Sequence, residues 1–229
     1  MSTIDRPEPR VLPPLVAGQR LDQPAFHERY EAMPPRTRAE LIGGIVYMPS
    51  PLTIEHGDRD SSVSDWLGHY RRFTKAIGKA LNATVQLDDF GESQPDCHLR
   101  IPEELGGQTR IVDGYVVGPP ELVVEVGKSS RRIDLGPKKA DYERAGVPEY
   151  LFVGVDPDEI LWFIRRGGRF LRLEEGLDGI LRSEVFPGLW LDPRAMLAGD
   201  IDRVYEVLDQ GLATPEHAAF VDRLAKAKA

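Results

Sequence analysis

The stretch covering residues 119–153 constrains the fold most, because it places two apolar runs on either side of a helix-like segment. The first run, residues 121–126, is rich in β-branched residues and follows two prolines, which is typical of a buried strand. A helix should then begin at Gly136-Pro137 and end at Gly146-Val147-Pro148, before a second strand that ends at Val153. This order predicts an α/β fold class.

Glu125 is a carboxylate near the end of that first strand, which is otherwise suited to a dry interior. An unpaired buried charge is costly, so we expect a cation opposite it. The following helix supplies Lys138, which lies four residues before Tyr142 and shares its face. Lys138 and Lys139 in a first turn would oppose the helix dipole, at about 0.3–1 kcal/mol each when exposed. The alternative is that both lysines are solvated and tolerated.

Composition restricts the classes of function. A chain of 229 residues is long enough for one domain with a substantial core. The single cysteine, Cys97, excludes an internal disulfide framework and indicates a cytoplasmic protein. We find neither a signal peptide nor an apolar run of membrane-spanning length, so we expect no membrane association. The net charge of −8 excludes a global basic field, so nucleic acid would need a local basic patch.

We expect three regions: a flexible arm over residues 1–22, a main domain over 23–197 and a helical tail over 198–229. The main domain should open with a short helix from residue 25, followed by a β-hairpin over residues 38–48 that turns at Gly43-Gly44. Glu40 lies in the first strand of this hairpin. Without further information, Glu40 is simply an exposed strand glutamate.

A helix over residues 55–76 should follow, with apolar residues at three- and four-residue spacing. His56, in its first turn, is expected to make a local hydrogen bond rather than bind a ligand. The other faces of the helix carry five cations that could contact phosphates, although such runs are usually solvated. These cations are Arg59, Arg71, Arg72, Lys75 and, just beyond the helix, Lys79.

Residues 81–87 and 93–101 have strand character, and Asp96 and His98 should point to the same face of the second strand. An antiparallel meander is predicted over residues 160–165, 169–173 and 180–186, because glycine-rich turns separate these runs. Two amphipathic helices, over 202–208 and 216–226, would form the tail and could pack late or contact a partner.

Several common chemistries have no support in the sequence. It contains no CxxC or HExxH zinc motif, no glycine-rich phosphate loop before a Lys-Ser pair and no serine in a nucleophile elbow. Oxygen ligands remain: Asp96, Glu125 and Glu40, with Lys138 nearby. Such hard ligands suit Mg²⁺ or Mn²⁺.

An ordered series of motifs resembles the Uma2 (DUF820) family of restriction-endonuclease-like proteins with the PD-(D/E)xK fold. The series consists of Glu40-Leu41-Ile42-Gly43-Gly44, Ser50-Pro51 with His56, Gln94-Pro95-Asp96, Glu121 to Val126, and Asp134, Lys138, Tyr142 and Gly146 to Tyr150. The resemblance implies a mixed β-sheet core flanked by helices. With the meander and tail, the expected fold is α/β (α+β).

The resemblance also implies roles for four residues. Asp96 would be the aspartate of PD and Glu125 the second carboxylate, and these two would hold Mg²⁺ or Mn²⁺. The simple pattern places its lysine two residues after Glu125, where this chain has Gly127. Lys138 would replace it from the helix, and Glu40 would join the site as an extra acid.

These roles predict a metal-dependent endonuclease that hydrolyses phosphodiester bonds of DNA. Lys138 would orient the attacking water or stabilise developing charge. A second interpretation is a catalytically inactive nuclease-fold module for binding or assembly, with a homodimer as one arrangement open to it. A third, a sugar or ester hydrolase using Asp96 and Glu125 as paired carboxylates, leaves Lys138 unexplained.

Overall fold

The computed structural model describes residues 12–49 and 51–228, so the part of the expected arm over residues 1–11 lies outside the described residues. Residues 12–22 pack against the domain. Leu15 is buried, and the Arg29 side chain donates hydrogen bonds to the carbonyls of Pro13 and Pro14. Helix α1 (Gln23–Glu31) follows, capped by Asp22, close to the expected position.

The central strands form a six-stranded sheet that bears the expected core motif. Its strand order is β12-β11-β10-β9-β6-β3, and β9 (Leu122–Gly127) pairs in parallel with β10 (Glu149–Gly154). The remaining strands are β3 (Gly78–Leu81), β6 (Cys97–Arg100), β11 (Ile160–Arg166) and β12 (Arg169–Arg172). Parallel neighbours need a crossover, and the helical segment between β9 and β10 supplies it. The predicted α/β class is therefore confirmed.

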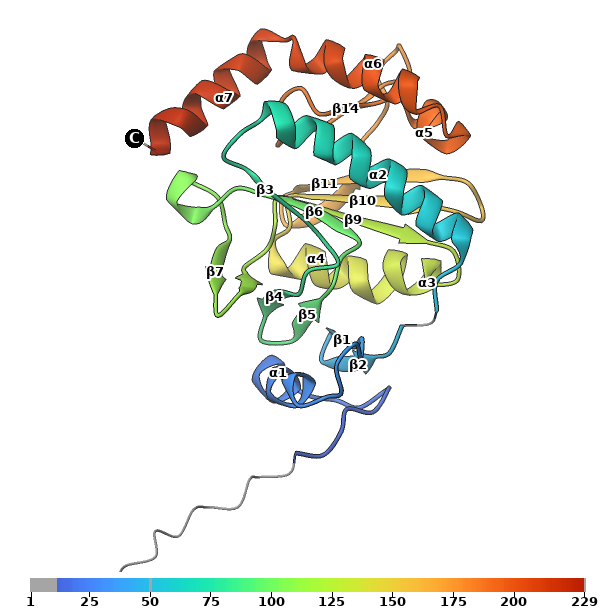
Figure 1. Cartoon of the computed structure of the whole chain (residues 1–229), viewed down its shortest axis with the longest axis vertical. Coiled ribbons are helices and arrows are strands. Elements are labelled where there is room, and N and C mark those ends of the chain that lie inside the picture. Colours follow the sequence, from blue (N-terminus) through green and yellow to red (C-terminus); the bar gives the residue numbers. More distant parts are fainter. Residues whose placement is uncertain (1–11, 50, 229) are drawn as a thin grey trace, which may run out of the picture.

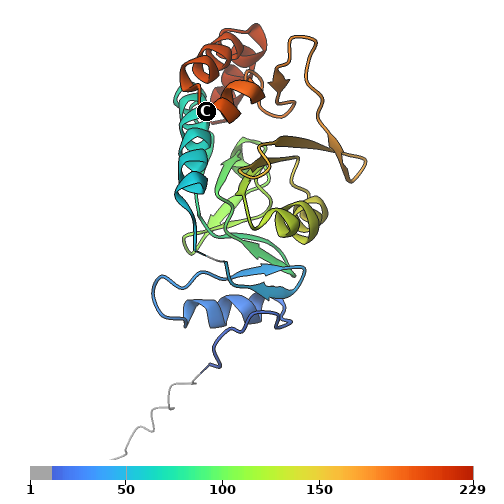
Figure 2. The ribbon, with the colours of Figure 1, turned by 90° about the vertical axis from the view of Figure 1, so that its right-hand side faces the viewer.

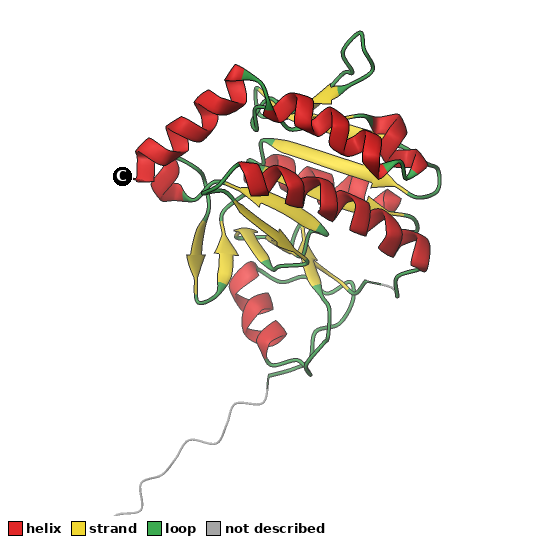
Figure 3. Ribbon diagram, turned by 45° about the horizontal axis from the view of Figure 1, so that its top comes forward, coloured by secondary structure: helices red, strands yellow, loops and turns green. Residues whose placement is uncertain are grey.

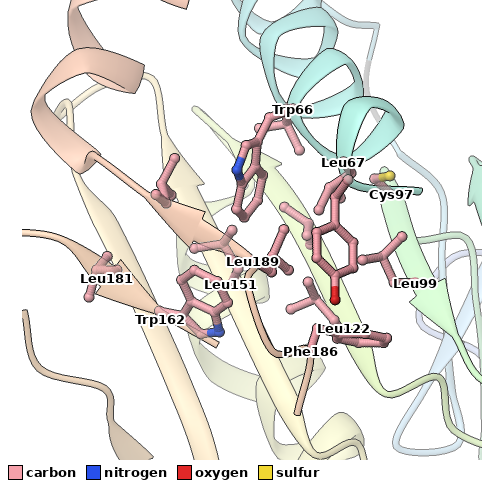
Figure 4. Packing of buried hydrophobic residues seen from close by; sticks show 14 of the residues in the cluster. Trp66, Leu67, Cys97, Leu99, Leu122, Leu151, Trp162, Leu181, Phe186 and Leu189 are labelled. Atoms are coloured by element: carbon pink, nitrogen blue, oxygen red, sulfur yellow. The ribbon is translucent and has the colours of Figure 1, made fainter. Parts of the chain in front are cut away.

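Helices cover both faces of this central sheet (Figure 1). Helix α2 (Ile54–Phe73) lies over one face, where the residues at its apolar spacing join the main core with Trp162 and Leu122. Figure 4 shows the packing of Trp66 against this core. On the opposite face, Tyr142 and Val147 of the crossover pack with Val123, Tyr150 and Phe152. Apolar packing on both faces of the sheet therefore fixes the register of β9.

A second six-stranded sheet, in the order β2-β1-β5-β4-β8-β7, lies beside the crossover helix and α1 (Figure 2). It consists of β1 (Glu40–Ile42), β2 (Ile45–Tyr47), β4 (Val85–Asp88), β5 (Gly91–Ser93), β7 (Arg110–Val112) and β8 (Tyr115–Val117). The predicted hairpin is confirmed, and Gly43 and Gly44 form its turn with φ of 58° and 73°. A short 3₁₀ turn, η1 (Glu103–Leu105), precedes β7.

Two sequence-based strand predictions were wrong. Residues 81–87 do not form one strand, because Asn82 has φ of 50° and separates β3 from β4, which belong to different sheets. The third strand of the expected meander does not pair with β12. Instead β13 (Leu181–Arg182) pairs with β14 (Trp190–Leu191) in a separate two-stranded ribbon.

The C-terminal helices contribute to the main core (Figure 3). They are α5 (Pro193–Ala198), α6 (Ile201–Leu212) and α7 (Pro215–Lys228). Val204, Leu208, Phe220 and Leu224 are buried in the same apolar cluster as α2. Within residues 12–49 and 51–228, none of the helices is both long and apolar enough to cross a membrane.

Candidate functional site

Asp96 and Glu125 lie at the same end of two neighbouring antiparallel strands. Strands β6 and β9 pair Cys97 with Val124 and His98 with Val123, so the residue before β6 lies beside the carboxyl end of β9. The backbone N–H of Val126 donates a hydrogen bond of 2.7 Å to Oδ2 of Asp96. This bond fixes the Asp96 carboxylate next to Glu125, as the sequence led us to expect.

Lys138 reaches the two glutamates from a kinked helix. The crossover consists of α3 (Arg131–Ile133), η2 (Asp134–Lys138) and α4 (Lys139–Ala145). Gly136 adopts non-helical angles, φ −109° and ψ −107°, and forms a kink before Pro137 that separates two helical segments. A helix therefore begins at Gly136-Pro137 as expected, but the helical turn that precedes it from Arg131 was not expected.

The ammonium of Lys138 bridges Glu40 and Glu125. Its Nζ lies 2.9 Å from Oε1 of Glu125 and 2.9 Å from Oε1 of Glu40. Lys138 is 5% exposed and Glu125 is 3% exposed, so this contact is almost free of solvent. Glu40 is held in turn by the backbone N–H of Gln94, which donates to it at 2.7 Å. The structure thus brings all four predicted site residues together.

Lys139, the neighbouring lysine, has a different environment. Its ammonium lies 3.6 Å from the centroid of the Phe163 ring, and Lys139 does not line the cavity that contains the predicted acids. Burial lowers the pKa of Lys139. For Lys138, burial alone would lower the pKa, but the carboxylates of Glu125 and Glu40 raise it well above its ordinary value. The two lysines therefore provide a matched pair for experiments.

Tyr142 was recognised in the sequence only as a residue on the same face as Lys138. Its hydroxyl donates to Oε1 of Glu125 at 2.6 Å, and Oγ of Ser93 lies within hydrogen-bonding distance of the phenol oxygen, at 3.2 Å. The same glutamate oxygen therefore receives both a phenol and an ammonium. The four-residue spacing between Lys138 and Tyr142 is the signal that could have revealed this shared target.

Asp134 is a further acid that the sequence did not identify as a site residue. It is 4% exposed and lies among the residues that line the same cavity. Its Oδ2 is buried without a hydrogen-bond partner in the described part of the chain. Burial raises the pKa of Asp134 to about 6, although Lys138 acts in the opposite direction.

Gly127 explains why the lysine cannot occupy the position two residues after Glu125. A Cβ there would lie 2.5 Å from the Phe152 ring and 2.8 Å from Oδ2 of Asp134. Real Cβ atoms do not approach neighbours this closely, so a side chain would displace one of these groups. Asp134 and Phe152 occupy the space beside Gly127, and the helix supplies the cation, Lys138.

His56 lies at the edge of the acidic group. It is 7% exposed, and its Nε2 is 3.8 Å from Oδ1 of Asp96, beyond hydrogen-bonding distance. The Asp96 carboxylate raises the pKa of His56, and burial opposes this effect. Nε2 is without a hydrogen-bond partner among the described residues. The local hydrogen bond expected from the sequence therefore stays a prediction.

A cavity of about 640 Å³ contains these groups. Five carboxylates line it together with His56 and three cations: Glu40, Asp96, Glu125, Asp134 and Asp156, and Arg38, Lys128 and Lys138. Burial raises the pKa of Glu125 well above its ordinary value, and Lys138 counteracts this increase. The apolar part of the lining comprises Ile42, Met48, Leu52, Val126 and Ile133.

The donor set of this cavity suits a hard divalent cation. Mg²⁺ needs only one or two carboxylates and keeps several waters. Asp96 and Glu125 are carboxylates in the cavity lining that would suit this number, and Oδ2 of Asp134 has no hydrogen-bond partner among the described residues. In residues 12–49 and 51–228, no three His, Cys, Asp or Glu side chains are already grouped as a metal cluster.

The cations along α2 do not form a free phosphate-binding row. Arg59 donates to the Met196 carbonyl and to Asp158, and Lys79 donates to Ser64. Arg72 lies over the ring of Phe73. At least three of the five cations therefore make contacts within the chain.

Comparisons with known proteins agree with this fold. A family model described as Uma2, "Putative restriction endonuclease", matches residues 25–194. A solved structure described as a putative nuclease belonging to DUF820, from Anabaena variabilis, superposes with a TM-score of 0.53 at 13% identity. The match covers 79% of this chain and 97% of that one. The comparison with curated proteins finds no match.

Proposed function

Because the chain belongs to the Uma2 family of restriction-endonuclease-like proteins, we propose that it is a Mg²⁺- or Mn²⁺-dependent endonuclease that hydrolyses phosphodiester bonds of DNA. The observation that carries this proposal is the buried ammonium of Lys138, which lies 2.9 Å from both Glu40 and Glu125. Asp96 completes the arrangement from the neighbouring strand. Together they give two hard ligands and a cation in one cavity.

Each residue has a distinct task in this proposal. Asp96 and Glu125 would hold the divalent cation, which when bound neutralises phosphate charge and makes a water molecule more acidic. Lys138 would donate hydrogen bonds to the attacking water or to a phosphate oxygen as charge develops. Glu40 would hold Lys138 in place, as its contact of 2.9 Å indicates.

The energetic cost of the arrangement supports a functional role. Burying several like charges around one ammonium disfavours folding, and a chain selected only for stability would more readily fill this space with apolar side chains. The raised pKa values of Glu125 and Asp134 reflect the cost of burial. Strongly perturbed carboxyl groups that line a cavity are typical of active sites.

The direct test is cleavage of labelled DNA by the full chain in Mg²⁺, in Mn²⁺ and in excess chelator. Asp96→Asn and Glu125→Gln should each abolish cleavage. Asp141→Asn is the control, because Asp141 is buried but binds the Gly43 backbone and Arg144 outside the cavity. Cleavage that survives in the Asp96 and Glu125 variants, or in chelator, would contradict the proposal.

A second candidate is an inactive nuclease-fold module for binding or assembly. The observation favouring it is that the ammonium of Lys138 already pairs with both Glu40 and Glu125. The net charge of −8 also disfavours tight DNA binding. Binding of DNA without turnover in either metal would favour this candidate.

We also propose a cytoplasmic location, because Cys97 is free and buried. We further propose that the chain forms a homodimer. The mass of the chain is 25.6 kDa, so light scattering distinguishes monomer from dimer at once.

A further inference from the structure

We propose that Asp134 is a third carboxylate of the cation site, and that its unpaired Oδ2 accepts a hydrogen bond from water bound to the divalent cation. This inference rests on the proposed function. It adds a residue to which neither the motif pattern nor the family description gives a role. The ligand is a hydrated Mg²⁺ or Mn²⁺ ion rather than a bare one, and its water donates the hydrogen bond.

The first support is the unused hydrogen-bonding capacity of Asp134. Its carboxylate is 4% exposed, and Oδ2 has no hydrogen-bond partner within the described chain. Buried carboxylate oxygens are normally paired, because an unpaired one has lost its hydrogen bonds to water without replacement. A water molecule held by a cation would supply the missing donor.

The second support is the local backbone structure, which leaves space for the Asp134 side chain and holds it in place. A Cβ at Gly127 would come within 2.8 Å of Oδ2, so only glycine leaves the carboxylate its position. The hydroxyl of Tyr150 donates to the Asp134 carbonyl at 3.1 Å and anchors its backbone. Asp134 and Lys138, the first and last residues of η2, both line the cavity.

The geometry favours an acceptor for water over a direct ligand. The described residues contain no trio of His, Cys, Asp or Glu side chains that is ready to enclose a metal. A Mg²⁺ ion that keeps several waters needs acceptors for them, and such groups orient the hydration shell. Asp134 lines the cavity that Asp96 and Glu125 line, which is the position such an acceptor requires.

Calorimetric titration of the full chain with Mn²⁺, without DNA, tests the inference. Asp134→Asn should weaken Mn²⁺ binding by about 10- to 100-fold, the usual effect of removing a group that orients metal ligands. Asp60→Asn is the matched control. Asp60 also has a buried unpaired oxygen and interacts with the charge of Asp96, but it does not line the cavity. Its substitution should have a smaller effect.

A purely structural role for Asp134 makes a different prediction for thermal stability. If the carboxylate served mainly to stabilise the helix, Asp134→Asn would lower the melting temperature. Under our inference the melting temperature of metal-free protein at pH 8 stays equal or rises, because an unpaired buried charge is removed. If the asparagine variant does not fold, Asp134→Ser provides the same test.

The outcomes separate this inference from the proposed function. Equal Mn²⁺ affinity in the Asp134→Asn and Asp60→Asn proteins overturns the role of Asp134. If Asp96→Asn still abolishes binding in that case, the proposed function stands. Failure of the wild-type chain to bind Mn²⁺ at all removes both. Weakening specific to Asp134→Asn supports the inference.

Discussion

The hydroxyl of Tyr142 donates a hydrogen bond of 2.6 Å to Oε1 of Glu125. Lys138, one helical turn earlier, contacts the same oxygen at 2.9 Å. The helix therefore presents two hydrogen-bond donors to one buried carboxylate oxygen. This relationship makes Tyr142 a positioning residue for Glu125.

Replacing Tyr142 by phenylalanine should weaken the site without removing any of its charges. Glu125 would lose a buried hydrogen bond, which costs about 1.5–3 kcal/mol of folding free energy when one partner is charged. We expect Mn²⁺ affinity to fall by about 10-fold or more, because Glu125 would be less well oriented. Urea denaturation and calorimetry measure the two effects.

Tyr70→Phe is the control for this substitution. Tyr70 is equally buried, but its hydroxyl donates to the Pro187 carbonyl, outside the cavity. We expect a loss of stability with Mn²⁺ affinity retained. Equal loss of Mn²⁺ affinity in both variants would show that Tyr142 has no special relation to Glu125.

Removing the ammonium of Lys138 should have a much larger effect on folding. In Lys138→Met, Glu40 and Glu125 would face each other without a counter-charge, which costs about 3–5 kcal/mol for a buried pair. Stability should partly recover as pH falls, because burial raises the pKa of Glu125 and protonation removes the repulsion. Denaturation at pH 8 and pH 5 measures this.

Two further variants test the cause of that effect. Lys139→Met removes a neighbouring lysine that lies over the Phe163 ring, so we expect a loss of at most about 2 kcal/mol. Adding Glu125→Gln to Lys138→Met should restore part of the lost stability. If the double variant is as unstable as the sum of the single ones, the two residues are not coupled.

The sequence was sufficient to predict the central strands and the acids because these depend on local patterns. The apolar run over β9 and the alternation around Asp96 are short-range signals, and antiparallel pairing brings them to one end of the sheet. The family resemblance then supplied the roles of Lys138 and Glu40. The geometry brings all four groups together, whereas their roles stay predictions.

Features that depend on long-range geometry were missed. A helix does begin at Gly136-Pro137, but the helical turn before it, from Arg131 to Leu135, was not expected. Asp134 was therefore named only as part of the family motif, without a role in the site. The split at Asn82 was missed for a similar reason, because tertiary pairing assigns the two halves to different sheets.

Gly127 stands two residues after Glu125, where the simple family pattern has its lysine. A substitution there tests how closely its neighbours pack around it. Gly127→Ala should lose about 1–3 kcal/mol of stability, because its Cβ would collide with the Phe152 ring. In Gly57→Ala, within α2, the new Cβ meets nothing within 4 Å and should gain about 0.5–1 kcal/mol. Equal effects in the two proteins would contradict the close packing around Gly127.

His98 should make the folded state sensitive to acid. Its ring is fully buried in β6, and burial lowers its pKa to about 4 from the ordinary 6.5. Between these values the unfolded chain binds a proton that the folded chain does not, so this contribution is complete above pH 6.5 and is lost as pH falls towards 4. A difference of this size corresponds to about 3 kcal/mol.

His98→Leu isolates this effect from the acids with raised pKa values, because their contributions cancel when the two proteins are compared. Neither ring nitrogen of His98 has a hydrogen-bond partner among the residues described, so leucine should be tolerated at pH 7.5. Urea unfolding should then show the variant gaining stability relative to wild type as pH falls from 6.5 to 4.5. A constant difference over that range would mean that His98 can be protonated in the folded protein without cost.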